Sequence, residues 1–402
     1  MPSDRSAAHT MKWPEVTEEK HPWTSRIPDD LVSRSVRERH AGPYRSAVTP
    51  AIAHIEIELP SRTLALADEA STEIVRFDAE LGTDVAPFAA ILLRSESASS
   101  SRIENLTSSA RAIALAELGN DNRQNAAEIV SNVHAMKAAI ELSDRIDESA
   151  ILAMHSALLI DHQPEIVGRW RDQQGWIGGN DYGPHQAAFV PPHQDRVPAA
   201  MADLIEFAQR DDIPVLVHAA LIHAQFETVH PFPDGNGRTG RALIHAILRR
   251  RGLTRNVTIP VSAGLLTDTN GYFDALTAYR SGEPEVIVTL MAEATFTAIT
   301  NGRLLVRDLK GARERWSEKI EARRDAVIWR IMDLLLRQPV VDTALVEREL
   351  DVTPANAGRA LLQLTSAGVT KEFSDKKRNR MWQAPEVLSA LDEFAARAGR
   401  RG

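Results

Sequence analysis

The chain has 402 residues, of which 43% are apolar and 25% charged, with a net charge of −8 and no cysteine. These values are typical of a globular protein of two or three domains, and they exclude disulfides, thiolate metal sites and cysteine nucleophiles. No apolar run approaches the roughly 18 residues that a membrane helix needs, so we expect no membrane contact. The N-terminus lacks the apolar core of a secretory signal, and we expect a cytoplasmic protein.

The periodicity of apolar residues predicts a mainly α protein. Residues 1–40 are polar and interrupted by proline, so an irregular segment is expected there. Apolar residues recur at helical spacing over residues 48–160 and again over 197–305, which predicts several helices in each range. Between Gly168 and Pro192, two extended runs flank the turn sequence GGNDYG, a pattern typical of a β-hairpin.

The C-terminal quarter differs from the rest in charge and pattern. A densely charged stretch, residues 306–323, predicts a solvated connector helix before a separate unit, residues 324–402. Three helical segments and two extended runs around a basic turn follow, an order that resembles a winged helix-turn-helix. The candidates for nucleic-acid contact are Arg359 in the third helix and, in the wing, Lys376, Lys377, Arg378 and Arg380. Residues 311–402 carry 17 Lys and Arg against 14 Asp and Glu, so DNA binding and protein contact are both open.

Chemistry-bearing residues gather in the stretch 226-FETVHPFPDGNGRTGRA-242, between two apolar helical runs. The first run places His230 at the end of a buried helix, and the glycine turn falls where the next helix begins. A helix N-terminus offers unpaired N–H groups and partial positive charge, and glycine lets a phosphate approach the backbone. Arg238 and Arg241 share a face of the first helical turns, so both guanidinium groups can clamp further phosphates.

Asp234 and His230 supply the remaining parts of a transfer site. Mg²⁺ is usually bound through one or two carboxylates together with phosphate oxygens, a role that suits Asp234. The imidazole of His230 is suited to act as a general base toward a hydroxyl. Base, metal ligand, phosphate cradle and arginine clamp together predict nucleotidyl or phosphoryl transfer.

The segment HPFPDGNGRTGR agrees with the Fic signature HxFx(D/E)GNGRxxR at every defined position, and the chain resembles the Fic family of protein adenylyltransferases. The resemblance implies transfer of AMP from ATP to a Ser, Thr or Tyr hydroxyl of a protein, with His230 as base and Asp234 as Mg²⁺ ligand. Tyr272 in YFDAL is expected near the adenine, although Phe273 replaces the second Tyr that the family often has. The residues expected to hold the phosphates are Gly235, Asn236, Gly237, Arg238, Thr239, Gly240 and Arg241.

A second segment, 100-SSRIEN-105, resembles the Fic inhibitory motif (S/T)xxxE(G/N), with Ser100 and Glu104 at the matching positions. In the family this glutamate pairs with the second arginine of the signature, here Arg241, and keeps the γ-phosphate from docking productively. A carboxylate and a phosphate cannot share one guanidinium. The resemblance therefore implies autoinhibition in cis by Glu104.

The predicted hairpin resembles the Fic flap, which holds the segment around the target hydroxyl by strand-like pairing. The candidate flap residues are Trp176, Ile177, Phe189 and Val190, each of which can equally be a core residue of the hairpin. The resemblance implies a Fic-type helical core with this flap, an N-terminal helical region and a small C-terminal winged helix-turn-helix. The expected regions are a tail (1–25), the helical region with the inhibitory motif (26–125), the catalytic core (126–305), the connector helix (306–323) and the winged-helix unit (324–402).

Other functions are open on the same residues. The scaffold can transfer other phosphate-containing groups, or remove AMP from a modified protein with the glutamate positioning a water. The chain can also be a DNA-binding regulator whose core senses nucleotide, or a toxin, although an inhibitory element in cis makes a separate antitoxin unnecessary. The expected ligands and partners are ATP, Mg²⁺, a protein substrate that includes the chain itself, and a second copy in a homodimer.

Overall fold

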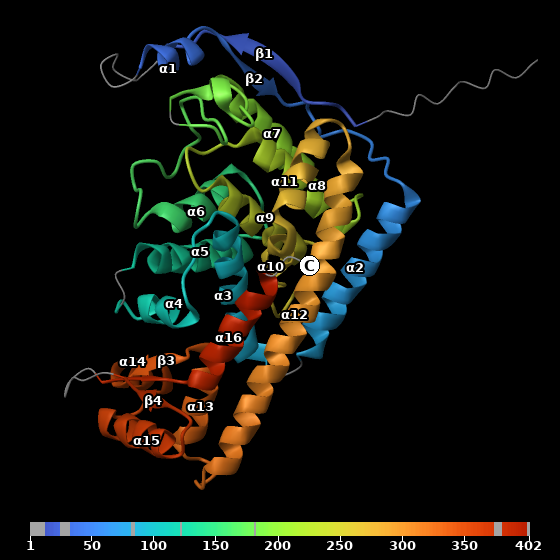
Figure 1. The fold of residues 1–402 in the computed structure, drawn as a ribbon. Coiled ribbons are helices and arrows are strands. Elements are labelled where there is room, and N and C mark those ends of the chain that lie inside the picture. The colour runs from blue at the N-terminus through green and yellow to red at the C-terminus, as the bar shows by residue number, and fades with distance from the viewer. Residues whose placement is uncertain are drawn as a thin grey trace, which may run out of the picture.

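The computed structural model describes residues 13–24, 33–81, 85–120, 123–180, 182–373 and 380–399. They form a mainly α protein, as predicted (Figure 1). The helices up to the end of the core are α1 (Arg34–Arg39), α2 (Ser61–Glu80), α3 (Val85–Ile103), α4 (Ala110–Glu117), α5 (Gln124–Glu141), α6 (Glu148–Leu159), α7 (Val197–Ala208), α8 (Val215–Val229), α9 (Asn236–Arg250), α10 (Val261–Leu265), α11 (Thr269–Arg280) and α12 (Pro284–Lys319).

Helices α8 and α9 form the centre of the core and carry the signature between them. Every residue of α8 from Leu216 to Val229 is buried, because the helix is surrounded by α2, α7, α9, α11 and α12. A helix that is buried on all sides is apolar all round, so its few polar residues stand out. Helix α9 packs against α8 and is contacted on other sides by α3, α5 and α6. The signature loop is therefore held by two of the most buried helices in the molecule.

The expected connector helix is not a separate element. Helix α12 runs unbroken from Pro284 to Lys319, so the predicted boundary at residue 305 lies inside it (Figure 1). The charged stretch stays helical because its apolar side, Leu309, Ala312 and Trp316, continues the buried stripe of the first half. Helix α12 therefore joins the core to the C-terminal unit without a break.

The prediction of an irregular N-terminus is wrong for part of its range. Residues Thr17–His21 form strand β1, which pairs antiparallel with β2 (Tyr44–Val48). Strand β2 in turn lies against the predicted flap, since the Ala47 N–H donates to the Val190 carbonyl at 2.9 Å. The sequence TEEKH gives no strand signal, because this pair is stabilised by backbone pairing rather than by an alternating apolar face. Residues 1–12 of the predicted tail lie outside the described residues.

The C-terminal unit has the three predicted helices and the two predicted extended segments, and in addition a strand, β3, that was not predicted. It comprises α13 (Val327–Arg337), β3 (Val340–Asp342), α14 (Thr343–Leu350), α15 (Pro354–Ser366), β4 (Lys371–Glu372) and β5 (Met381–Gln383), with an antiparallel sheet in the order β3-β5-β4. The predicted wing residues Lys376, Lys377 and Arg378 lie outside the described residues. Arg380 forms an ion pair with Glu372. The winged-helix assignment and DNA binding stay predictions.

A last helix, α16 (Pro385–Ala398), was not predicted and leaves the C-terminal unit to pack on the core. It lies along α12 and contacts α3 and α4 (Figure 1). Arg102 of α3 donates through Nη1 to the Ala395 carbonyl at 2.7 Å, and Asp392 accepts from the Ala110 N–H at 3.1 Å. None of the described helices is long and apolar enough to cross a membrane.

Candidate active site

The signature loop joins the end of α8 to the start of α9. His230 ends α8 in a left-handed conformation, with φ 50° and ψ 61°, and its N–H donates to the Phe226 carbonyl at 2.8 Å. A residue with a Cβ is strained there, and such strain is common at functional sites. Gly235 also has positive φ, 74°, and directly precedes α9. The first N–H groups of α9 have no acceptor within the helix, so the loop presents donors to a ligand.

Buried contacts fix the shape of this loop. The side chain of Asn236 accepts from the Phe232 N–H and donates to the Phe232 carbonyl, each at 2.8 Å. The Phe232 ring stacks on His155 of α6, with ring centroids 3.7 Å apart and an interplanar angle of 1°. Burial lowers the pKa of His155 to about 4, so this ring is neutral and its Nε2 donates to the Asp234 carbonyl at 3.1 Å. Asn236 therefore closes the loop with its side chain, which leaves only its N–H for a ligand.

A cavity of about 710 Å³ opens in front of the loop. The predicted residues on its wall are Glu104, Ile177, Phe189, His230, Asp234, Gly235, Asn236, Gly237, Arg238, Arg241 and Tyr272. These residues come from the turn after α3, the predicted flap, the signature loop, α9 and α11. The fold thus brings together the predicted base, metal ligand, phosphate cradle and arginine clamp.

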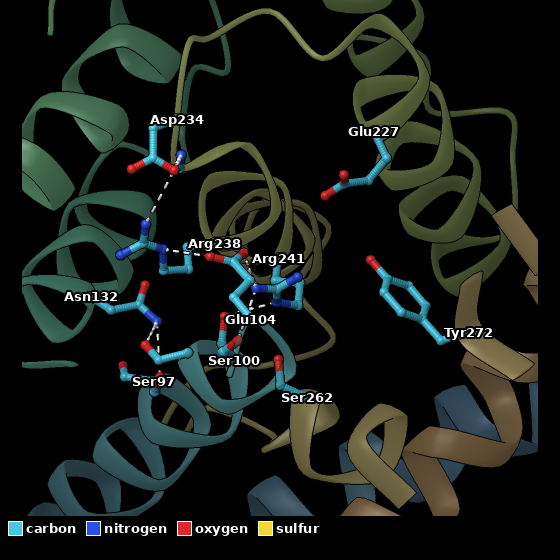
Figure 2. A network of polar contacts seen from close by, with 12 residues as sticks. Ser97, Ser100, Glu104, Asn132, Glu227, Asp234, Arg238, Arg241, Ser262 and Tyr272 are labelled. Atoms are coloured by element: carbon cyan, nitrogen blue, oxygen red, sulfur yellow. Dashed lines mark hydrogen bonds and ion pairs between the residues drawn. The ribbon is translucent and has the colours of Figure 1, made fainter. Parts of the chain in front are cut away.

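Glu104 bridges both arginines of the signature. Its Oε1 accepts from Arg241 Nη2 at 2.7 Å, and its Oε2 lies 2.8 Å from Arg238 Nε (Figure 2). The two arginine side chains are 3% and 2% exposed, whereas the Glu104 side chain is 28% exposed. Arg241 also donates to Ser100, to Oγ at 2.8 Å and to the carbonyl at 2.9 Å. Ser100 does not reach the cavity, but it accepts hydrogen bonds from Arg241 and so positions the guanidinium group that binds Glu104.

Two backbone features let Glu104 reach the arginines. A Cβ on Gly237 would lie 2.3 Å from Glu104 Oε1, so a side chain at this position would collide with the carboxylate. Asn105 follows Glu104 with φ 63°, a left-handed conformation that Asn tolerates better than most residues. These contacts explain in physical terms why glycine and asparagine stand at these positions.

His230 is partly buried, with its side chain 22% exposed, in a positive environment. Burial, together with the positive charges of Arg171 and Arg280, lowers its pKa to about 3. The ring is therefore neutral near pH 7 and can accept a proton. Arg171, which the sequence analysis did not single out, donates through Nε to the His230 carbonyl at 2.8 Å and through Nη2 to the Pro192 carbonyl. This arginine ties the signature loop to the end of the predicted flap.

Asp234 presents a partly open carboxylate to the cavity. Its Oδ1 accepts from the Gly235 N–H at 2.6 Å and its Oδ2 accepts from Gln163 Nε2 at 2.9 Å, while the side chain stays 46% exposed. No cluster of three or more His, Cys, Asp or Glu able to hold a metal occurs within the part of the chain that the structure describes. A single held carboxylate fits a hard cation whose other ligands are phosphate oxygens and waters.

The predicted flap residues divide into two pairs. Ile177 and Phe189 form an isolated antiparallel bridge, with the Ile177 N–H donating to the Phe189 carbonyl at 2.8 Å, and both line the cavity. Trp176 faces the other way and packs edge-on against Trp23, with ring centroids 5.8 Å apart. Val190 uses its carbonyl to pair with β2. The N-terminal segment therefore occupies the side on which Trp176 and Val190 were expected to receive a target.

Thr239 and Gly240 are not on the cavity wall, so their predicted nucleotide contact is not supported. They lie between Arg238 and Arg241 on α9, and about 100° of rotation per residue turns them toward the protein interior. Thr239 is fully buried, and a Cβ on Gly240 would lie 3.0 Å from Phe226 of α8.

Two cavity residues from α8 and α11 were missed. Arg280 stacks over the Phe189 ring, with Cζ 3.7 Å from the ring centroid, and burial lowers its pKa to about 10. Tyr272, Leu276 and Arg280 all line the cavity at helical spacing, so the periodicity of α11 could have identified Arg280. Glu227 lies one helical turn before His230, and the one acidic residue in the largely apolar α8 was a signal.

Known proteins resemble this chain in sequence and fold. Residues 145–248 match the family model described as Fic/DOC family. The protein adenylyltransferase fic-1 of Caenorhabditis elegans is 32% identical over 121 residues, which are 29% of this chain and 22% of that protein. The protein adenylyltransferase Fic of Nematostella vectensis is 28% identical over 160 residues, which are 39% of this chain and 34% of that protein. The chain thus spans between about a fifth and a third of the length of these curated relatives.

The fold resembles that of a solved structure over most of the chain. The crystal structure of a Fic family protein from Desulfovibrio desulfuricans G20 covers 84% of this chain and 98% of its own, with a TM-score of 0.53 and 20% identity. This likeness concerns the fold alone. Residues 145–248, which contain the signature, are thus similar to the Fic/DOC family, and most of the chain is similar in fold to a Fic family protein.

Proposed function

We propose that the chain is a protein adenylyltransferase that Glu104 holds inactive. The observation that carries the proposal is the Glu104 carboxylate on both guanidinium groups of Arg238 and Arg241, at the N-terminus of α9 and on the wall of the cavity that holds His230. A triphosphate needs the same donors, and a guanidinium that binds a carboxylate is not free for a phosphate. The names of the relatives, which are protein adenylyltransferases, support the same activity.

The chemistry follows from the residues around the cavity. His230 takes the proton of the target hydroxyl at Nε2, the hydroxyl oxygen forms a bond to the α-phosphorus of ATP, and the bond from that phosphorus to the bridging oxygen breaks, releasing pyrophosphate. The N–H groups of Asn236 and Gly237 hold the α-phosphate, Gly235 forms the left-handed turn that precedes them, and the two arginines hold the β- and γ-phosphates.

Asp234 is the residue that would hold Mg²⁺. Its carboxylate is fixed by Gly235 and Gln163 and remains partly exposed on the cavity wall, which fits a cation shared with phosphate oxygens. When bound, Mg²⁺ neutralises phosphate charge and so favours departure of pyrophosphate.

The target protein would pair with the Ile177–Phe189 bridge, because it lies on the cavity wall. An extended segment beside this bridge presents its hydroxyl toward His230 by strand addition. The chain itself is one such substrate when a flexible segment reaches its own or a second copy's cavity. The winged-helix unit has no assigned part in this reaction.

Intact mass spectrometry after incubation with ATP and Mg²⁺ tests the proposal. We expect Glu104→Gly to gain the mass of AMP, whereas the wild type and Glu104→Gly with His230→Ala gain none. A thermal-shift titration with ATP is the control, since loss of the base leaves the phosphate cradle in place. If Glu104→Gly gains no mass from ATP or transfers AMP equally without His230, the proposal is wrong.

A further inference from the structure

Glu227 is a buried acid that the proposed reaction does not yet use. It lies on α8 one turn before His230, and its side chain is 9% exposed on the wall of the cavity. Its Oε1 has no hydrogen-bond partner among the described residues. Figure 2 shows its carboxyl group pointing into the site, on the side away from Asp234. A buried polar atom without a partner is rare in native proteins and calls for a physical reason.

The charge state of Glu227 is set by its surroundings. Burial raises its pKa to about 7, Arg241 and Arg280 oppose this rise, and the negative charge of Glu104 adds to it. The pKa lies well above the ordinary carboxyl value, so Glu227 is neutral below about pH 7 and ionised above it. The titratable groups that face it are His223 and His230 from α8, Arg241 from α9, Tyr272 and Arg280 from α11, and Glu104 after α3.

Glu227 faces the nitrogen of His230 that does not take part in the proposed proton transfer. Its Oε2 lies 3.9 Å from His230 Nδ1, and its backbone carbonyl also faces the imidazole and raises the pKa of His230 slightly against the effect of burial. His230 Nδ1 itself makes no hydrogen bond in this structure. Catalytic hydrogen bonds are often long without ligand and shorten in the reacting complex.

A carboxylate next to His230 would make protonation of its imidazole less unfavourable. Burial and two arginines make the imidazolium form of His230 unfavourable, yet that form must arise when the target hydroxyl gives up its proton. An anion beside Nδ1 stabilises the imidazolium and fixes the tautomer with the proton on Nδ1, which leaves Nε2 as the acceptor.

We infer that Glu227, acting as a carboxylate, is a positioning residue for the catalytic His230, a role that rests on the proposed function. The Nδ1–H of His230 donates to Glu227, and Nε2 takes the proton of the target hydroxyl as its oxygen bonds to the α-phosphorus. The bond to the bridging oxygen breaks, pyrophosphate leaves, and the proton on Nε2 passes to solvent. Removal of Glu104 also removes a negative charge that faces Glu227, so the same event frees the arginines and favours the ionised form of Glu227.

Gly240 leaves room for the carboxyl group of Glu227. A Cβ on Gly240 would lie 3.1 Å from Glu227 Oε1 and 3.0 Å from Phe226, so a side chain there would press on the wall that carries the carboxyl group. The packing of α9 on α8 therefore explains why glycine stands at position 240, although Gly240 does not contact the cavity.

The test compares Glu104→Gly, Glu104→Gly with Glu227→Gln, and Glu104→Gly with Glu227→Asp by initial rates of AMP incorporation over a range of pH and ATP concentration. We expect Glu227→Gln to lower kcat by roughly 10- to 100-fold, a smaller effect than loss of a general base, and to leave KM for ATP within about twofold. The decline of the parent's rate as pH falls through the ionisation of Glu227 should flatten in the Gln variant. The Asp variant should recover part of kcat and restore that decline.

Four results would overturn the inference. Unchanged kcat and an unchanged pH profile in the Gln variant would mean that the Glu227 backbone carbonyl alone orients His230. A rise in KM with kcat preserved, or equal losses in the Gln and Asp variants with the pH profile retained, would indicate a structural role. An inactive Glu104→Gly parent would contradict the proposed function itself, and the inference with it.

Discussion

Two glutamates, Glu96 in helix α3 and Glu104 just after the end of that helix, contact neighbouring elements and differ in burial. Glu96 is fully buried and accepts from the Ser262 N–H at 2.8 Å and from Ser262 Oγ at 2.6 Å, and its Oε1 lies 2.8 Å from His245 Nε2. Glu104 is 28% exposed and contacts two arginines that are almost fully buried. Both glutamates contact residues of α9, and we expect that only the second can be removed without opening the core.

The difference in burial predicts that the Glu96 contact is kept, whereas the Glu104 contact can be released. The acid of Glu96 has partners for both oxygens from α9 and α10, so losing it leaves buried polar groups without partners. The acid of Glu104 stands on a cavity wall, where a phosphate can take its place. We therefore expect the part of α3 around Glu96 to stay in place while the turn after the helix, which carries Glu104, moves.

The largest effect is expected from breaking the buried contact. Glu96→Ala should lower the free energy of unfolding by about 3–5 kcal/mol, because it leaves His245 and Ser262 unpaired in the core. Urea denaturation measures this change. Glu104→Ala, just beyond the end of the same helix, is the matched control, and its loss should be clearly smaller, because Glu104 lies on a cavity wall where water can take the place of the carboxylate. Equal losses in the two variants would refute the distinction.

An intermediate effect is expected from Gly237→Ala, which adds a methyl group where Glu104 Oε1 lies. We expect a loss of about 1–3 kcal/mol in the wild type, as for other overpacked sites, and a smaller loss in Glu104→Gly. Gly358→Ala on α15 is the control, since a Cβ there meets nothing within 4 Å. Thermal denaturation of the wild type, Gly237→Ala, Glu104→Gly and the double variant measures these losses. Equal losses with and without Glu104 would contradict the contact.

A smaller effect is expected from Ser100→Ala. Arg241 would lose the hydroxyl acceptor at 2.8 Å but keep the Ser100 carbonyl and Glu104. One neutral acceptor is worth about 1 kcal/mol, so self-modification of the otherwise wild-type chain should rise by about fivefold at most. The same substitution in Glu104→Gly should leave the rate of AMP incorporation unchanged, and a large change there would mean that Ser100 acts on ATP rather than on the glutamate.

The sequence predicted the site best where the functional residues are close neighbours in the chain. His230, Asp234 and the arginines lie within one loop and one helical turn, so their proximity follows from local structure alone. The pairing of Glu104 with Arg241 was predicted from a motif, whereas its second contact, with Arg238, follows from how α3 crosses α9. That crossing depends on the packing of buried side chains and is not visible in a linear pattern.

The missed features depend on contacts between distant segments. Strand β1 has no apolar alternation, and α16 leaves its own unit to pack on the core. Arg171 and Glu227 reach the site through tertiary packing. Glu227 stands out only as the one acidic residue of the largely apolar α8, and Arg171 lies in a polar segment where no local pattern distinguishes it. Thr239 and Gly240 were assigned by their place in the signature, although the helical rotation turns them away from the cavity.

The central claim is that Glu104 restrains the reaction by occupying the arginine that a γ-phosphate needs. Initial rates of AMP incorporation by Glu104→Gly and by Glu104→Gly with Arg241→Ala test it most directly. We predict that the double variant loses most of the gain, by about 100-fold or more, because the released guanidinium is what orients the triphosphate. A double variant as active as Glu104→Gly would contradict the claim.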